Sequence, residues 1–511
     1  MLQKGIHVVI VILVMLFLGC APKKEIAIKP NIIFILADDL GYGEVGAYGQ
    51  KLIRTPHMDQ LANNGMLFTQ HYSGAPVCAP SRYIFLTGQH AGHAFIRGND
   101  EWKERGDVWN YEAVSLDPAL EGQRPIPETT ITLAKQLKEV GYATSILGKW
   151  GLGAPQSSGV PNLQGFDYFY GYNCQRQAHN LYPPHLWEND VKDSLNNALI
   201  IPHQKLDSLL NPYEESSYQA FTQKDYAPEK IHQKALRFIK ENSGAPFFMY
   251  YASPLPHLPL QAPKEYVDDY RKIFGDEEPY LGDKGYFPNR YPRATYAAMI
   301  SYLDQQIGEL VTTLKEEGIY ENTVIIFSSD NGPTYTGGVD FDFFESSKPF
   351  SNGYGKTKGF VYEGGIRVPM IVSWPNHIKA GSVSSHISSF YDLMPTICDL
   401  TGAALPSAID GMSFMPELFE EEQHTHDFLY WEFPSYKGQQ AVRMGSWKGI
   451  RKNIFDGNLN IELYHLEEDP QEQIDISEAH PEIVLKIKSI MREAHNPSEN
   501  ERFQFKELGD N

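Results

Sequence analysis

Two pairs of oxygen-bearing side chains follow apolar runs that are typical of buried strands. Asp38 and Asp39 come after the run 31–36, and Asp330 and Asn331 come after the run 323–327. Three carboxylates and one amide oxygen form a hard ligand set that suits Ca²⁺, with Mg²⁺ as the alternative. A single pair of this kind could equally cap a helix or a turn. Two pairs, one on either side of a reactive cysteine in the chain, favour a metal site.

That cysteine is Cys78, a candidate nucleophile. It opens the pentapeptide Cys78-Ala79-Pro80-Ser81-Arg82, and Leu86-Thr87-Gly88 follows. The segment resembles the formylglycine sulfatase family, in which the cysteine of a C-x-P-S-R motif is oxidised to an aldehyde before the enzyme works. A chance pentapeptide around a buried cysteine is the alternative. The resemblance implies that a formylglycine-generating or anaerobic sulfatase-maturing enzyme converts Cys78. It also implies a metal held by Asp38, Asp39, Cys78, Asp330 and Asn331.

The chemistry of a sulfate ester explains why an aldehyde is useful. An ordinary serine that attacked the ester would be left as a sulfated serine, which water cleaves slowly. A hydrated aldehyde has two hydroxyls: one attacks sulfur in line while the alcohol leaves, and the other then expels sulfate as the aldehyde re-forms. This is covalent catalysis with a release step built into the nucleophile.

Three cations would balance the negative charge of such a site. Three acids beside a divalent ion and an incoming sulfate leave excess negative charge, so cations are needed. The resemblance assigns Arg82 to the hydrated aldehyde, and Lys149 and Lys358 to the sulfate oxygens. Lys356 lies close by, but the step from Lys358 to Tyr362 fits the family segment better. Outside such a motif, a lone lysine is usually a solvated surface charge.

A proton donor and one departure complete the catalytic set. His257 follows Ser253-Pro254-Leu255-Pro256 and matches the family histidine that protonates the leaving oxygen, work that suits imidazole near neutral pH. A histidine filling a polar gap in the core is the alternative. Many family members carry a second histidine two residues after the first lysine, whereas this chain has Gly151. Either the reaction tolerates the loss, or another group such as His179 replaces it.

The substrate is indicated by a segment rich in tyrosine, histidine, arginine and glutamine. Residues 164–187 show no clean period, so we expect an active-site loop, although a surface loop packed by its own aromatics is the alternative. Aromatic rings stack on sugars and polar side chains bind hydroxyls, which favours a sulfated carbohydrate, with galactose or N-acetylgalactosamine as the candidate sugar. The candidate substrate-binding residues are Gln175, Arg176 and His179, and more weakly Arg97, Asn99 and Glu432.

Two other classes of protein compete with this interpretation. A phosphate or phosphonate ester hydrolase of the same superfamily would more simply use serine or threonine with histidine-rich transition-metal sites, whereas Asp and Asn ligands are indicated here. A glycan-binding lipoprotein that has lost catalysis is suggested by Gly151, but every other catalytic residue type is retained.

The elements that must position these residues alternate along the chain. Strands are expected at 31–36, 143–147, 246–251, 323–327 and 369–373, and helices at 55–65, 130–140, 294–317 and 390–400. Such alternation predicts an α/β fold with a largely parallel sheet, whose ligands collect at the carboxyl ends of the strands. Those ends carry Asp38, Lys149, His257 and Asp330. The resemblance adds that the fold is alkaline-phosphatase-like.

The pattern changes after Gly402. Strands are expected at 428–433, 439–451 and 461–466, followed by an amphipathic helix at 480–494, which together predict a small antiparallel sheet with a helix packed on it. We therefore expect a signal peptide at 1–20, a tether at 21–30, a catalytic domain at 31–402 and a C-terminal α+β subdomain at 403–511. The family resemblance runs from about residue 29 to about 500.

The N-terminus and the composition indicate the compartment and exclude one partner. Lys4, the apolar stretch Val8 to Leu18, and Gly19-Cys20 are typical of a bacterial lipoprotein signal, with a plain signal peptide as the alternative. We expect lipid on Cys20 to anchor an exported protein in the bacterial envelope. A formal charge of −20 argues against a nucleic-acid partner. Of the four cysteines, Cys174 and Cys398 could form a disulfide or remain buried thiols.

Overall fold

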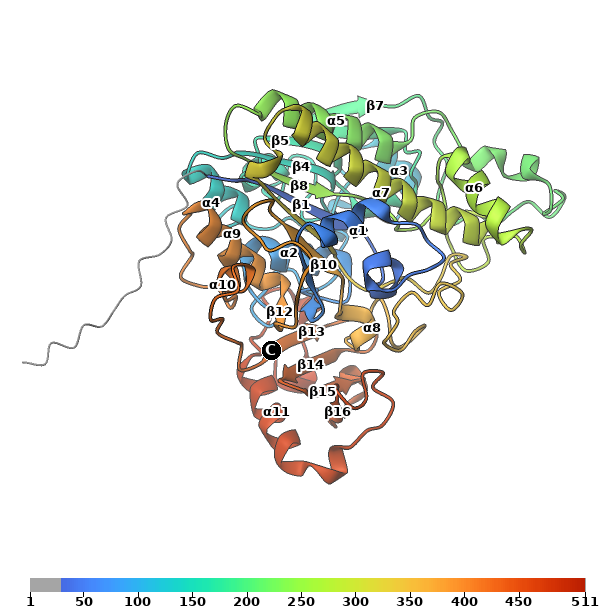
Figure 1. Ribbon diagram of the computed structural model, residues 1–511. Coiled ribbons are helices and arrows are strands. Elements are labelled where there is room, and N and C mark those ends of the chain that lie inside the picture. The colour runs from blue at the N-terminus through green and yellow to red at the C-terminus, as the bar shows by residue number, and fades with distance from the viewer. Residues whose placement is uncertain (1–28, 511) are drawn as a thin grey trace, which may run out of the picture.

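A ten-stranded sheet forms the centre of the computed structural model, which describes residues 29–510 (Figure 1). Five neighbouring strands run parallel: β9 (Thr323–Ser329), β1 (Asn31–Ala37), β8 (Phe247–Ala252), β4 (Ala143–Lys149) and β5 (Tyr168–Tyr172). Shorter strands extend both edges: β10 (Met370–Ser373), β2 (Met66–Phe68) and β11 (Ser382–Ser384) beyond β9, and β6 (His185–Glu188) and β7 (Val191–Ser194) beyond β5. The predicted α/β fold with a largely parallel sheet is confirmed.

Strand β1 shows why this sequence makes a sheet covered on both faces. All its residues are buried, and consecutive side chains point to opposite faces. Phe34 belongs to one hydrophobic core, while its neighbours Ile33 and Ile35 belong to the other. A strand that is apolar on both sides can only be satisfied between two layers of helices.

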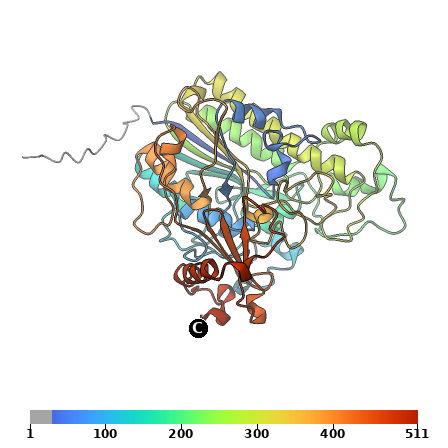
Figure 2. The same cartoon turned by 60° about the horizontal axis from the view of Figure 1, so that its bottom comes forward.

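Helices provide those two layers (Figure 1, Figure 2). One layer is formed by α1 (Pro56–Asn63), α5 (Ala227–Asn242) and α7 (Pro292–Glu316), whose buried residues share a core with Ile33 and Ile35. The other is formed by α2 (Cys78–Thr87), α4 (Leu133–Glu139) and α9 (Leu393–Thr401). Cys78 is the first residue of α2, and Asp38 and Asp39 directly follow β1, so these packed layers position the candidate site.

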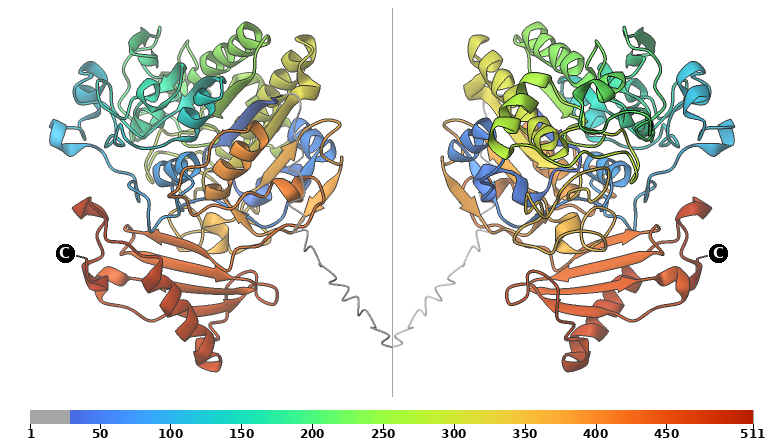
Figure 3. Two further views of the ribbon diagram at one scale, coloured as in Figure 1. Left: turned by 90° about the vertical axis from the view of Figure 1, so that its left-hand side faces the viewer. Right: turned by 90° about the vertical axis from the view of Figure 1, so that its right-hand side faces the viewer.

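The chain ends in a four-stranded antiparallel sheet with a helix beneath it (Figure 3). Its strands are β13 (Leu429–Phe433), β14 (Gln439–Met444), β15 (Trp447–Lys452) and β16 (Glu462–His465), and its helix is α11 (Pro481–Glu493). Alternate residues of β13 divide between two cores. Trp431 faces the large core, whereas Tyr430 packs with Ile487 and Met491 of α11. The small sheet is thus joined to the main body by a buried face.

Three local features differ from what the sequence suggests. The expected strand 439–451 is the hairpin β14–β15, because Gly445 takes a φ of +58° and turns the chain. The expected loop 164–187 contains the buried parallel strand β5, strand β6 and the 3-10 helix Gln175–His179. Strand β10 pairs antiparallel with β9. Residues 403–428 place Phe414 and Leu418 in the same large core that Leu429 and Trp431 of β13 enter, so the boundary expected near 402 stays a prediction.

The two cysteines other than Cys78 in the described residues are not linked. Cys174 and Cys398 are buried free thiols in the structure, so they do not pair. Within residues 29–510, no helix combines the length and the apolar character that crossing a bilayer requires. The predicted signal peptide and Cys20 lie outside the described residues.

Candidate active site

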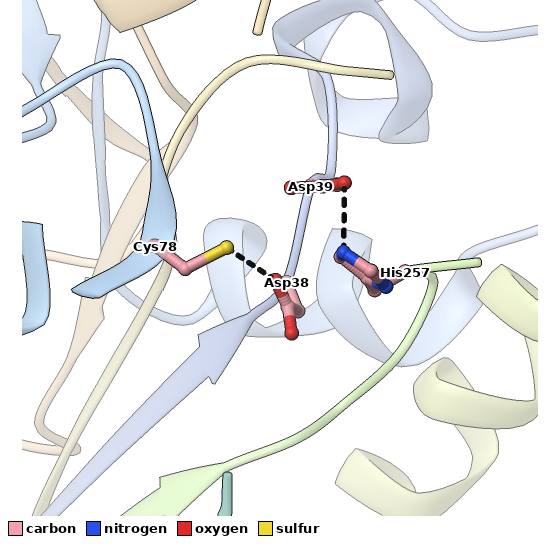
Figure 4. A group of neighbouring side chains, drawn as sticks. All are labelled: Asp38, Asp39, Cys78 and His257. Carbon is pink, nitrogen blue, oxygen red and sulfur yellow. Dashed lines mark hydrogen bonds and ion pairs between the residues drawn. The ribbon is translucent and has the colours of Figure 1, made fainter. Parts of the chain in front are cut away.

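The predicted nucleophile and the first acidic pair converge at one end of the parallel strands (Figure 4). Asp38 and Asp39 directly follow β1, Cys78 is the first residue of α2, and His257 follows β8. The Cys78 thiol donates to Asp38 Oδ1 at 3.3 Å, and His257 Nε2 lies 3.7 Å from Asp39 Oδ2. Four side chains from three separate segments thus share one buried site.

Parallel register brings the second pair to the first. Ala37 of β1 is aligned with Ser329 of β9, so Asp38 and Asp330 each come one residue past the aligned ends. The backbone then turns sharply at Asp39, which has a φ of +66°, and its N–H donates to Asp330 Oδ1 at 3.1 Å. A non-glycine residue in the left-handed region is strained, and such strain concentrates at functional sites.

The second pair offers oxygen atoms suited to a cation. Asn331 Nδ2 donates to Asp39 Oδ1 at 2.8 Å, while Asn331 Oδ1 is buried without a hydrogen-bond partner. A buried acceptor left without a donor is costly unless something binds it, and an amide oxygen is a ligand for Ca²⁺ or Mg²⁺. Candidate ligand atoms of Asp38, Asp39, Cys78 and His257 also lie within 4.8 Å of one another. The residues present therefore fit a divalent cation.

The three predicted cations each contact an acid of the site. Lys149 Nζ lies 2.5 Å from Asp38 Oδ2 and 3.5 Å from Cys78 Sγ. Lys358 Nζ lies 2.6 Å from Asp39 Oδ2, whereas Lys356 is directed to the Glu472 carbonyl and the Tyr362 ring. Arg82 donates twice to Asp330 Oδ2, at 2.7 and 3.0 Å. Three positive and three negative side chains are thus interleaved around Cys78.

Burial and these charges set the protonation of the site. Burial raises the pKa of the Cys78 thiol, and the negative charge of Asp38 raises it further. Burial and Asp38 also raise the pKa of Asp330, to about 7. Burial opposes ionisation of Asp38 as well, but Lys149, and then His257 and Arg82, lower its pKa below the usual range. Unmodified Cys78 is therefore a protonated thiol, which is a poor nucleophile.

His257 is held in a defined orientation. Its Nδ1 donates to the Leu258 carbonyl at 2.6 Å, which leaves Nε2 facing Asp39. Burial, and then the charges of Lys358 and Lys149, lower its pKa well below 6.5. His179 stacks on it with ring centroids 5.3 Å apart, and Tyr286 packs edge-on to both rings. Bringing a substrate anion to the two lysines would favour the protonated ring.

The gap at Gly151 is filled by a different residue from the one suggested. A Cβ built on Gly151, where φ is +80°, would lie 2.4 Å from Gln175 Cγ. The Gln175 side chain therefore occupies this space, while His179 lies on His257. Gln175 Oε1 is buried without a hydrogen-bond partner, and its Nε2 lies 3.5 Å from Asn99 Oδ1. Asn99 in turn accepts from the N–H of Ala79, next to Cys78.

The other candidate substrate-binding residues, Arg97, Glu432 and Arg176, form their polar contacts with other groups of the protein. Arg97 and Glu432 form a buried ion pair with each other, and Glu432 also contacts His495 and Tyr430. This pair fastens the C-terminal sheet to the main body, because Arg97 also donates to the Asn496 carbonyl. Arg176 donates to the carbonyls of Val108 and Trp109. A charged side chain in the sequence carries no sign of whether its partner is a ligand or another buried residue.

Sequence reasoning missed two side chains that pack against His179. His203 accepts or donates at 3.3 Å with His179, and Tyr286 packs against both His179 and His203. Both come from segments without periodic pattern, and both have positive φ, 66° and 63°. No sequence signal marks such positions, because the strain depends on contacts that form only in the fold.

Comparison with known proteins gives consistent matches over nearly all of the described chain. The family model named Sulfatase matches residues 30–403, and the model named N-sulphoglucosamine sulphohydrolase, C-terminal, matches residues 354–496. Human arylsulfatase A is 32% identical over 448 residues, covering 85% of this chain and 77% of its own length. The N-acetylgalactosamine-6-sulfatase of dog, Canis lupus familiaris, is 30% identical over 496 residues, covering 91% and 84%.

A solved structure has a similar fold over most of the chain. The crystal structure of Ps i-CgsB in complex with k-i-k-neocarrahexaose has a TM-score of 0.71 and 27% identity, and the match covers 91% of this chain and 93% of that one.

Proposed function

The chain belongs to the sulfatase family and is a sulfuric ester hydrolase, and from this premise we propose that it removes sulfate from a carbohydrate through a formylglycine at position 78. The observation that carries the proposal is the position of Cys78. Its side chain is 1% exposed and lies among three carboxylates and three cations, where a protonated thiol could do little. Conversion to an aldehyde replaces a poor nucleophile by a hydrate.

Maturation of Cys78 precedes hydrolysis of the sulfate ester. A maturing enzyme supplies a two-electron oxidant: the CH₂–SH group and one oxygen at the level of water become CHO, hydrogen sulfide, two protons and two electrons that the oxidant accepts, and the aldehyde then adds a water molecule. One hydrate hydroxyl then attacks sulfur as the sugar oxygen leaves with a proton. The second hydroxyl loses its proton, sulfate departs, and the C=O bond re-forms.

Each neighbouring side chain has a role that its contacts support. Arg82 and Lys149 border Cys78 and would hold the hydrate and a sulfate oxygen. Lys358, with its ammonium on Asp39, would hold a second sulfate oxygen. His257 presents Nε2 toward the site and would give the proton to the leaving sugar oxygen. These positive groups would stabilise the negative charge that develops as the bond between sulfur and the sugar oxygen breaks.

A divalent cation fits the same site. Asp38, Asp39, Asp330 and Asn331, with the modified residue 78, would hold Ca²⁺ or Mg²⁺ through oxygen atoms. When bound, the ion would supply positive charge to the sulfate group and to the hydroxyl of residue 78. With the ion present, Lys149 and Lys358 would be released from the acids to contact substrate.

A sulfated sugar is supported by the relatives and by the polar rim of the site. The dog relative is named for N-acetylgalactosamine 6-sulfate, and the solved structure holds a neocarrahexaose. In this chain, His179 and Tyr286 pack against His257, where the sugar oxygen would leave, and His203 packs against both of them. We therefore favour a sulfate ester of galactose or N-acetylgalactosamine type.

We also propose export and lipid anchoring in the bacterial envelope. The support is the sequence Val8 to Cys20, which places a small residue and a cysteine after an apolar stretch. A Cys20→Ser variant should move from the membrane fraction to the soluble periplasmic fraction when expressed in a bacterial host. Unchanged membrane recovery of that variant would contradict lipid attachment at Cys20.

The deciding experiment joins mass spectrometry to a substrate panel. Protein made in its native host, or with a maturing enzyme, should give a peptide in which the Cys78 thiol is replaced by an aldehyde. The same protein should release sulfate from at least one sulfated sugar, and Cys78→Ala should abolish that release. Cys398→Ala is the matched control, because it removes another buried thiol and should leave activity intact. An unmodified thiol in active protein would overturn the aldehyde mechanism.

A further inference from the structure

Four aromatic rings form a continuous cluster beside Lys358, which we call the tyrosine platform. Its members are Tyr335, Tyr354, Phe360 and Tyr436, and the ring centroids of successive members lie 5.3, 5.2 and 5.1 Å apart. Two members are open to solvent: Tyr354 is 72% exposed and Tyr436 is 47% exposed. Large exposed aromatic surface is unusual on a soluble protein and marks binding sites.

The platform borders the catalytic site through Gly359. The Gly359 N–H donates at 2.8 Å to the carbonyl of Pro76, two residues before Cys78. On its other side, a Cβ built on Gly359 would lie 2.9 Å from the Tyr436 ring. One glycine therefore separates Tyr436 from the nucleophile loop, and Lys358 immediately precedes it.

The C-terminal subdomain holds Tyr436 at the cost of backbone strain. The turn between β13 and β14 has positive φ at three consecutive residues, +48° at Tyr436, +70° at Lys437 and +78° at Gly438. Only the last is a glycine, and a bulky side chain in the left-handed region is a genuine outlier. Strain of this kind persists where surrounding structure imposes it and clusters at ligand-binding positions.

The platform has the chemistry of a sugar-binding surface. Burial, and then a hydrogen bond with Tyr436, raise the pKa of the Tyr335 phenol, and this bond links the first ring of the platform to the last. Ring faces offer apolar area, and phenol groups offer a polar edge. A pyranose ring has the complementary pattern, with C–H bonds on its faces and hydroxyls at its rim.

We propose that the tyrosine platform binds the sugar ring next to the sulfated one, so that the enzyme acts preferentially on oligosaccharides. The inference rests on the proposed function and goes beyond it, because it assigns a second subsite and gives the C-terminal subdomain a part in substrate binding. The occupant is a neutral or sulfated pyranose of the same glycan chain, since the platform continues directly from Lys358 in the catalytic site.

The test compares chain lengths in two variants. Tyr436→Asn removes the ring while placing a residue that tolerates positive φ, and Tyr354→Ala removes the other exposed ring. With a sulfated galacto-hexasaccharide, each should raise KM about tenfold with kcat nearly unchanged. With the matching galactose sulfate, both constants should stay at the wild-type value. An equal effect on both substrates, or none on either, would overturn the inference.

The control is the neighbouring residue of the same turn. Lys437→Asn relieves the same kind of strain and keeps all four rings, so its KM for the hexasaccharide should match that of the wild type. Failure of the proposed function would look different, because wild-type protein would then release no sulfate from either sugar. In that case calorimetric binding of the hexasaccharide still decides: Tyr436→Asn should weaken it about tenfold relative to Lys437→Asn.

Discussion

The side chain of Gln175 occupies the space that a side chain at position 151 would need. Gln175 Cγ lies where a side chain at position 151 would begin, and Gln175 reaches toward Asn99 beside the nucleophile helix. An alanine at 151 would have to displace Gln175 and would also take an unfavourable positive φ. Position 151 can therefore tune the site without itself touching substrate.

We expect Gly151→Ala to lower kcat/KM about a hundredfold, because displacing Gln175 by roughly 1 Å would shift groups next to Cys78. Adding Gln175→Ala removes the clash and should recover most of the loss, which steady-state sulfate release would measure. The single variant Gln175→Ala completes the double-mutant cycle. A double variant no better than Gly151→Ala would show that backbone strain, rather than Gln175, causes the defect.

Bound cation should stabilise the fold as well as the site. Without the ion, the carboxylates of Asp38, Asp39 and Asp330 repel one another and Asn331 Oδ1 has no partner. Loss of the ion should therefore lower the free energy of unfolding. At a hundred times its dissociation constant, Ca²⁺ would add about 2.7 kcal/mol. Chelation should lower the melting temperature, and Ca²⁺ should restore it more fully than Mg²⁺.

A matched pair of variants locates that effect. His90, His93 and Asp410 form a second group that could hold a metal, and it shares no residue with the first. Asn331→Ala should largely remove the Ca²⁺-dependent rise in melting temperature, whereas Asp410→Asn should keep it. The reverse pattern would place the stabilising ion outside the catalytic site.

At the residue scale, sequence reasoning succeeds where a motif fixes chemistry and fails where tertiary packing does. The acidic pairs and Cys78 come together because the parallel register of β1 and β9 aligns the strand ends and α2 begins beside them. Gln175 could not be assigned to the space over Gly151, because nothing in sequence spacing shows which side chain fills a cavity. For the same reason Arg97 and Glu432 looked like ligand-binding residues although they bind each other.

At the element scale, long periodic segments were predicted and interrupted ones were not. The expected helix 294–317 corresponds to α7 (Pro292–Glu316), and the expected strand 323–327 lies within β9. Strand β5 was hidden among aromatic residues, since its run Tyr168–Tyr172 is short and lacks the aliphatic character of its neighbours. The hairpin β14–β15 is predicted as one strand because a glycine alone does not mark a turn: Gly445 turns the chain, whereas Gly449 lies within β15.

His495 bridges two acids, Glu432 of β13 and Asp510 near the end of the described chain. His495 Nδ1 lies 2.7 Å from Glu432 Oε2, and its Nε2 lies 2.8 Å from Asp510 Oδ1. Burial lowers the pKa of His495, but the hydrogen bond and charge of Glu432, and then Asp510, raise it above 6.5 overall. Because the folded pKa is the higher one, this stabilisation is complete below the unfolded pKa and is lost as pH rises through the folded pKa.

His495→Gln should therefore destabilise the protein more at pH 6 than at pH 9. The expected loss at pH 6 is about 2 kcal/mol, the size of hydrogen bonds between charged groups. Melting temperatures of wild type and variant at both pH values would measure it, and Asp510→Asn should show part of the same dependence. A difference independent of pH would mean that the ring is held as a neutral side chain.

At the scale of the whole molecule, the distribution of charge matters more than its sum. The chain carries a formal charge of −20, yet Arg82, Lys149 and Lys358 gather at the site that would receive a sulfate anion. A net negative charge disfavours the approach of polyanions, while the local cations can accept one anionic group. A net negative charge therefore argues against a nucleic-acid partner without arguing against a sulfated glycan.

Another buried charge cluster joins the two units of the molecule. Lys448 of β15 lies 2.8 Å from Glu363, in the helix α8 (Glu363–Ile366) of the main body, and 2.9 Å from Glu472. Both carboxylates and the lysine are fully buried. Burial opposes ionisation of Glu363, but Lys448, and then Arg367, lower its pKa to about 2, whereas burial raises the pKa of Glu472 to about 7.

Lys448→Met should lower the free energy of unfolding by about 3–5 kcal/mol, because it leaves Glu363 buried with less compensation. Lys452→Met is the control: this lysine lies in the same strand and pairs with Glu462, but it is 43% exposed, so its loss should cost at most about 1 kcal/mol. Denaturant unfolding measures both, and hydrogen exchange should show lost protection in β14 and β15 only for Lys448→Met. Equal destabilisation by the two substitutions would mean that the hydrophobic face of Trp431 and its neighbours, rather than this ion cluster, holds the C-terminal sheet to the main body.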